Sequence, residues 1–219
     1  DTDSSQTLTN KTIGTGQVIA TGSTTARLLA DRFAEVVNIA DHGGLPGASA
    51  ATNDAAIVAA LAYMVSSGKR TLQFNEGTYA ITTWLATSGL HGITVRGRGI
   101  HSTYIEGTGA GAYTFKMSNN IYWTIEDLSF DGNMVKNAAA LLADGIVSGC
   151  IFKHVGFIDG AVNNLVLGDT GNNDISTNTF EECEVSWYTA CSISQGSLKI
   201  LGTNTGANAW ISGRIATDN

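Results

Sequence analysis

The chain has little charge and almost no proline. Asp, Glu, Lys and Arg together make up 14% of its 219 residues, against roughly 25% in an ordinary globular domain. Pro46 is the single proline, whereas glycine occurs 26 times. Low charge and frequent glycine favour short strands joined by tight turns over long surface helices.

Basic residues are scarce as well. The chain has 12 Lys and Arg against 19 Asp and Glu, a formal net charge of −7. Nucleic acid is bound through clusters of Lys and Arg, so we exclude nucleic acid as a partner. No stretch approaches the roughly 18 uninterrupted apolar residues of a membrane span, and residues 1–5 lack the basic and apolar parts of a secretion signal. We therefore expect no membrane insertion and no signal peptide.

Cysteines are few and have no metal-ligand spacing. The three, Cys150, Cys183 and Cys191, are an odd number, and Cys183 occupies a position where the sequence pattern calls for an apolar side chain. A buried free thiol behaves as a small hydrophobe. We expect neither a disulfide framework, nor a metal site, nor a cofactor, and we expect the chain to assemble in a reducing cytoplasm.

Four short segments share one pattern, with an apolar residue at the first, fourth and sixth positions. They begin at Leu90, Ile125, Phe152 and Phe180, so the unit recurs about every 30 residues, which predicts a repeat architecture. A second apolar run follows three of them, at residues 139–142, 164–167 and 191–194. Three parallel strands per coil would bury a continuous interior, and the fold class predicted is an all-β solenoid.

The part before the repeats divides into an arm, a helix and a capped beginning of the solenoid. Residues 1–22 are rich in Thr, Ser, Gly and Asn, which predicts a flexible N-terminal arm or linker. Apolar residues at helical spacing predict a short neck helix over 23–37, which would be marginal alone and must dock on the next domain or on another copy. Residues 38–219 form the solenoid, with a capping helix at about 52–67, begun by Thr52, Asn53 or Asp54 and ended by Gly68, and coils from about residue 71.

Two sets of segments resemble known families. Residues 36–43, 53–61 and 72–81 resemble the opening strand, helix and strand of the pectate-lyase-like superfamily, which implies a right-handed parallel β-helix with an N-terminal capping helix. Residues 6–13 and 25–38 resemble the N-terminal side of bacteriophage tail fibre and tailspike proteins. That resemblance implies a homotrimer in the virion tail, assembled in the host cytoplasm. It would bind and often cleave a bacterial surface polysaccharide, attach to other tail or baseplate proteins through its N-terminal arm, and continue past Asn219.

The repeat pattern also predicts one polar face. If the fourth and sixth positions point inward, the third and fifth point outward, which aligns Asp127, His154 and Glu182 in one column. Asp127 and Glu182, two coils apart, would lie about 9 to 10 Å from each other, near the separation of about 6.5 to 9.5 Å in inverting glycosidases. His154 between them would be held protonated.

A second carboxylate pair lies just beyond the column. Asp131 and Asp159 would be about one coil apart, near the roughly 5 Å of retaining enzymes or of a pair that shares a proton. The predicted sites are therefore catalytic Asp127, Glu182, Asp131, Asp159 and His154, and substrate-binding Glu184, Arg96, Trp187 and Tyr188.

A structural interpretation of the same residues competes with this one. Exposed strand carboxylates are usually only solvated, the Asp-Gly pairs at 131 and 159 are common turn dipeptides, and Trp187 and Tyr188 also suit packing within turns or between subunits. Three functions follow: a tailspike section that binds and depolymerises polysaccharide, a non-enzymatic adhesin section of a tail fibre, and a free polysaccharide lyase. The lyase would need Ca²⁺ ligands and a base beside an acidic sugar, which a mostly acidic face suits poorly.

Overall fold

The computed structural model describes residues 36–142, 145–168, 174–186, 198–200, 206 and 208–215, and two short strands nearer the N-terminus. The chain divides into two compact units, residues 1–36 and 37–219.

The N-terminal unit contains a two-stranded antiparallel sheet. Strand β1 (Gln17–Val18) pairs with β2 (Arg27–Leu28). Arg27 and Leu28 are therefore extended, and Val37, the last residue of the predicted neck helix 23–37, begins strand β3 (Val37–Asn38) of the second unit. The helix prediction is wrong at these three residues. A helix of about 15 residues is marginal on helix propensity alone, and strand pairing satisfies the same backbone groups. The remaining residues of the arm and of the neck helix before Val36 lie outside the described residues.

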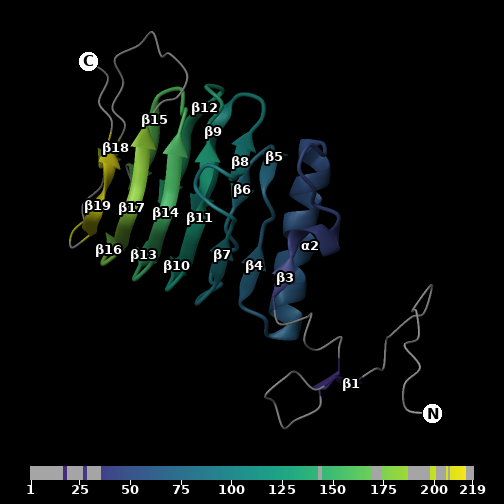
Figure 1. The fold of residues 1–219 in the computed structure, drawn as a ribbon. Coiled ribbons are helices and arrows are strands. Elements are labelled where there is room, and N and C mark those ends of the chain that lie inside the picture. The colour runs from purple at the N-terminus through teal and green to yellow at the C-terminus, as the bar shows by residue number, and fades with distance from the viewer. Residues whose placement is uncertain are drawn as a thin grey trace, which may run out of the picture. The chain divides into compact units, whose positions relative to one another are not determined.

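The second unit is a right-handed parallel β-helix of about four turns with one helix near its N-terminal end (Figure 1). The prediction of a parallel solenoid is confirmed. Every strand pair in this unit is parallel. Its longest sheet runs in the order β19, β17, β14, β11, β7, β4, β3, with β8 pairing β11 and β5. The bounds are β3 Val37–Asn38, β4 Thr71–Gln73, β5 Gly77–Ile81, β7 Thr94–Arg96, β8 Thr103–Gly107, β11 Thr124–Asp131, β14 Ile151–Ile158, β17 Thr179–Ser186 and β19 Ala209–Ile215.

Two further sheets close each coil. One runs β18, β15, β12, β9, β6 and the other β10, β13, β16. Their members are β6 Trp84–Leu85, β9 Gly111–Met117, β12 Lys136–Leu142, β15 Asn163–Leu167 and β18 Leu198–Ile200, and β10 Asn120–Ile121, β13 Ile146–Ser148 and β16 Asp174–Ser176.

A left-handed residue in the middle of each long strand explains the spacing of the apolar positions. Asp127, His154 and Glu182 have φ of 56°, 49° and 50°. Each bends its strand and resets the inward and outward alternation, which is why the buried residues are the first, fourth and sixth rather than the first, third and fifth.

The first repeat was placed in the wrong register. Ile125 pairs with Val95, not with Leu90, so the first coil is shifted by five residues from its predicted position. A loop, residues 97–102, separates β7 from β8 and breaks the pattern in this coil. Leu90, Ile93 and Val95 are all buried, so they have the same apolar spacing as the repeat although only Val95 lies in the paired strand β7.

Stacked aromatic rings fill the interior. Phe115 and Phe130 are parallel with centroids 4.3 Å apart, and Phe152 and Phe180 are parallel at 4.8 Å. Trp210 of β19 continues the second stack on Phe180 at 5.2 Å. Phe152, Phe180 and Trp210 share one register on β14, β17 and β19, and because neighbouring coils are about 4.8 Å apart, their rings come to van der Waals contact. Phe115 of β9 and Phe130 of β11 belong to different sheets and stack across the interior.

Helix α2 (Ala50–Ser67) covers the N-terminal end of the solenoid, as predicted. It is capped by Ser49, whose Oγ accepts a hydrogen bond from the Thr52 amide at 3.2 Å, and not by Thr52, Asn53 or Asp54. The C-cap is Gly68, at φ 72°, as predicted. Asp54 instead accepts a hydrogen bond from the Thr82 amide at 3.0 Å.

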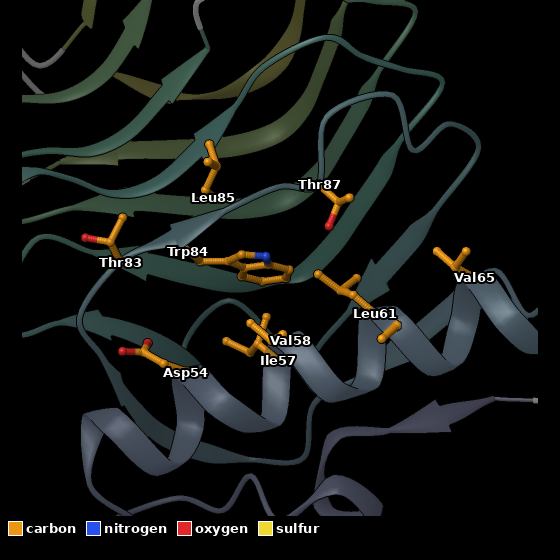
Figure 2. Close-up of a pocket in the computed structure, with 10 residues that line it drawn as sticks. Asp54, Ile57, Val58, Leu61, Val65, Thr83, Trp84, Leu85 and Thr87 are labelled. Carbon is orange, nitrogen blue, oxygen red and sulfur yellow. The ribbon is translucent and has the colours of Figure 1, made fainter.

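One side of α2 contributes to an apolar groove. Ile57, Leu61 and Met64 are buried, but Val58 and Val65 are 69% and 57% exposed. They line a groove of about 370 Å³ between α2 and β6 (Figure 2), together with Asp54, Ile57, Leu61, Ala62, Thr83, Trp84, Leu85 and Thr87.

Asn53 joins the capping helix to the first coil, and its loss should destabilise the fold. The side chain is 1% exposed; its Oδ1 accepts from the Leu45 amide and its Nδ2 donates to the Ala80 carbonyl, both at 3.0 Å. Asn53→Ala is expected to lower the free energy of unfolding by about 1 to 2 kcal/mol in urea denaturation followed by circular dichroism. The exposed Asn137→Ala is the control, with a change within about 0.5 kcal/mol; equal losses in the two variants would contradict the prediction.

Candidate functional site

One flank of the solenoid carries charges that alternate from coil to coil. In the strand register, Arg96 is followed by Glu126, Lys153 and Glu181 on successive coils. The adjacent column contains Asp127, His154 and Glu182. Opposite charges therefore face each other across neighbouring strands, an arrangement that stabilises one register; Lys153 Nζ lies 3.5 Å from Glu181 Oε1.

The predicted column of three residues is assembled as a hydrogen-bonded bridge. His154 Nδ1 lies 3.1 Å from Asp127 Oδ1, and Nε2 is hydrogen-bonded to Glu182 Oε2. The hydrogen bond with Glu182 and then that with Asp127 raise the pKa of His154. The imidazole occupies the space between the two carboxylates, where an inverting hydrolase would hold its water.

The bridge makes stability depend on pH in a defined direction. Because the pKa of His154 is higher in the folded than in the unfolded chain, its contribution is fully present below about pH 6.5 and is lost as pH rises through the folded pKa. His154→Gln should remove this pH dependence. The contribution of His154 to the free energy of unfolding is expected to be less than about 1 kcal/mol, because its side chain is 38% exposed. Urea denaturation at pH 5.5 and 8.5 measures it, with Lys153→Gln as the control that keeps the bridge. An unchanged difference between the two pH values in His154→Gln would contradict it.

Beyond the bend, the same sheet has a partly covered acidic face. Tyr104, Ser129, Gly156 and Glu184 share one register on successive coils. Residues 97–102 lie over the middle of this column, because Ser129 Oγ donates to the Ile100 carbonyl at 2.5 Å. Ser129 and Gly156 in the middle of this column are therefore buried, and Tyr104 and Glu184 at its two ends are partly exposed.

On this face, the pKa of Asp131 is raised well above its ordinary value. Burial raises its pKa to about 6; the Asn133 amide, which donates to Oδ1 at 2.6 Å, opposes the shift, and the charges of Asp159 and Glu106 add to it. In the register, Asp131 is opposite Ile158, so Asp159 lies one residue further along the next coil, where it is 5% exposed. The two carboxylates predicted as a pair are thus on adjacent coils but not at equivalent positions.

Tyr104 and Glu184 surround the same region. Burial raises the pKa of Tyr104, and the charges of Asp131 and Glu184 raise it further. Glu184 Oε1 accepts from Ser186 Oγ at 2.8 Å, and its carboxylate lies 3.7 Å from His101 Nε2 and 3.8 Å from Arg214 Nη1. This face therefore combines Asp131, whose pKa is raised to about 6, with the carboxylate of Glu184, which is fixed by its contacts with Ser186, His101 and Arg214.

A polar hollow of about 360 Å³ adjoins the bridge on the side of the capping helix. It is lined by Gln73, Arg96, Gly97, Arg98, Glu126 and Asp127. The structure thus brings together Arg96 and Asp127, which the sequence analysis proposed as substrate-binding and catalytic. Trp187 and Tyr188 lie outside the described residues.

Four residues of this flank were missed by the sequence analysis: Gln73, Arg98, Tyr104 and Glu106. Tyr104 and Glu106 belong to β8, whose burial alternates residue by residue. That alternation is visible in the segment 103–107, and the misplaced first repeat concealed it. Within the described part, no three His, Cys, Asp or Glu side chains are grouped as ligands for a metal ion, and none of its helices is long and apolar enough to cross a membrane.

Two solved structures with a similar backbone come from a bacterium and from a virus. One is a "putative glycosyl hydrolase" from Parabacteroides merdae ATCC 43184, with a TM-score of 0.53, 13% identity and coverage of 80% of this chain and 96% of that chain. The other is ORF18 of Geobacillus virus E2, with a TM-score of 0.55, 18% identity and coverage of 78% of this chain and 42% of that chain. At such identities the likeness shows the fold alone.

The sequence itself matches no known family model. No curated protein matches it either.

Proposed function

We propose that this chain is a section of a phage tailspike that binds a bacterial surface polysaccharide along the flank of β7, β8, β11, β14 and β17, and that cleaves it. The observation that carries the proposal is Asp131, a half-buried acid whose pKa is raised to about 6. It lies on the same strand as Glu126 and Asp127, which line the polar hollow, and four residues beyond Asp127. Two solved structures named as a glycosyl hydrolase and as a virus protein share the fold, which supports this choice.

The proposed cleavage is a hydrolysis with two carboxyl groups. Asp131 gives its proton to the glycosidic oxygen as the bond from that oxygen to the sugar carbon breaks. Glu184 takes a proton from a water molecule whose oxygen bonds to the same carbon. Glu184 shares the register of Ser129, which lies two residues before Asp131. The backbones of Asp131 and Glu184 are therefore two coils and two residues apart, about 12 Å. Their side chains must extend toward each other to reach the roughly 6.5 to 9.5 Å between the carboxyl groups of inverting enzymes.

A second candidate function is binding without cleavage. It is favoured by the bridge itself, since both carboxylates of the column are hydrogen-bonded to His154 and are not available to a substrate as acid and base. In that case the chain is an adhesin section of a tail fibre that carries downstream receptor-binding domains.

The products of incubation with polysaccharide distinguish these functions. The chain is incubated with a panel of capsular and lipopolysaccharide glycans, and the product ends are identified by mass spectrometry. Addition of water at each new end is expected; an unsaturated sugar end would identify a lyase, and binding without products would identify the adhesin. The control for Asp131→Asn is Asp41→Asn, an exposed acid at the capped end. Equal activity of the two variants would contradict the role of Asp131.

We further propose that the assembled protein is a homotrimer that attaches to other tail or baseplate proteins through its N-terminal residues. Light scattering of the purified chain is expected to give the mass of three copies. A monomer at micromolar concentration would contradict the trimer for this chain.

A further inference from the structure

We infer that the polar hollow lined by Arg96 and Arg98 is a subsite for the carboxylate of a sugar acid. The inference rests on the proposed function and specifies the substrate class for this part of the flank. It depends on how the two guanidinium groups are held, on what they contact and on the local charge.

Arg96 is oriented by a buried amide. Gln73 is 4% exposed, and its Nε2 donates to the carbonyls of Phe74, Arg96 and Gly97 at 2.6, 3.2 and 3.1 Å. This fixes its Oε1, which accepts from Arg96 Nε at 2.6 Å. The two terminal nitrogens of Arg96 make no hydrogen bond or ion pair within the described part of the chain, so they remain available to a ligand.

Arg98 is held next to Arg96 by the tight packing of the residue between them. A Cβ on Gly97 would lie 2.3 Å from the Asp127 carbonyl oxygen, so only glycine allows this approach to the next coil. The Arg98 amide donates to Thr103 Oγ1 at 2.9 Å, which fixes the backbone on the other side. The Arg98 side chain is exposed, and its guanidinium has no partner among the described residues.

The local charge suits a monoanion. Arg96 and Arg98 contribute two positive charges and Glu126 one negative charge, while Asp127 is bridged to His154. A planar carboxylate takes two parallel hydrogen bonds from a guanidinium. A phosphate dianion carries one more negative charge than a carboxylate and would be repelled more strongly by Glu126, so a carboxylate is the favoured ligand. Glu126 would accept hydrogen bonds from hydroxyl groups of the same sugar.

The test compares sugars that differ only in the carboxyl group. The ¹⁵N-labelled 219-residue chain is titrated with methyl glucuronide and methyl glucoside, with the matching galacturonide and galactoside, and with inorganic phosphate. The signals of the Arg Nε–Hε groups are followed by NMR. At least one uronide is expected to shift the Arg96 and Arg98 signals and to bind at least tenfold more tightly than its neutral partner. Arg98→Gln should remove that preference, and Lys116→Gln, on β9 in another sheet, should keep it.

The outcomes separate this inference from the proposed function. If the chain retains a polysaccharide of the panel but binds uronides no better than neutral sugars, or Arg98→Gln changes nothing, the inference fails and the proposed function stands. Tighter binding of phosphate than of every uronide would overturn the assignment to a carboxylate. If no saccharide of any kind binds, the proposed function fails and the inference fails with it.

Discussion

Phe130→Ala is expected to lower the free energy of unfolding by about 3 to 5 kcal/mol. Phe130 has no exposed surface and lies in the middle of the stacked interior, with Phe115 at 4.3 Å and Phe157 at 6.1 Å between ring centroids. Its removal leaves a cavity that the neighbouring coils cannot close, because their backbones are fixed by the strand hydrogen bonds on both sides.

Chemical denaturation followed by circular dichroism measures this loss. Tyr122→Ala is the matched control, since Tyr122 is an aromatic residue two positions before β11, the strand of Phe130, and is 67% exposed; its change should stay within about 1 kcal/mol. A loss at Phe130 no greater than at Tyr122 would mean that the aromatic stack does not hold the coils together.

Asp131→Asn is expected to make the protein more stable and less active at once. The folded chain holds the Asp131 proton more tightly than the unfolded chain, because the pKa is raised to about 6. Stability is therefore lost as pH rises from about 4 to 6, by about 2 to 3 kcal/mol in total. The Asn variant carries no charge and should exceed the parent by up to that amount at pH 7.5.

The comparison is made by urea denaturation at pH 4 and pH 7.5. The two proteins should be about equally stable at pH 4, where the Asp131 carboxyl is largely protonated. If the chain hydrolyses a glycan, the variant should lose at least about a hundredfold in rate, the usual contribution of a general acid. A variant that is less stable than the parent at pH 7.5 would show that Asp131 is held by favourable contacts and not strained by burial.

The regular part of this fold could be predicted from sequence because each coil repeats the same burial. The apolar residues at Ile125, Phe152 and Phe180 recur on neighbouring strands in one register, and the outward residues between them recur with it. That is why Asp127, His154 and Glu182 could be aligned before the structure. The capping helix could be predicted for a similar reason, since its buried residues have helical spacing and Gly68 ends it.

The irregular parts could not be predicted in this way. The loop 97–102 is inserted into one coil only. The repeat pattern therefore predicted neither the strand partner of Val95 nor that the side chains of Tyr104 and Glu106 point outward. Lys136 is a further example, since it is 1% exposed although lysine is almost never buried. It is accommodated because Gly107 and Gly111 leave room for its side chain, and its Nζ lies 3.5 Å from Thr83 Oγ1 on another coil.

Glycan binding along the charged flank is tested by a map of backbone amide shifts on titration with a polysaccharide fragment that binds. We expect the shifts to concentrate on β7, β11, β14 and β17, at Arg96, Asp127 and His154 and their neighbours. Shifts confined to the apolar groove between α2 and β6 (Figure 2), or to the sheet of β9, β12 and β15, would contradict it.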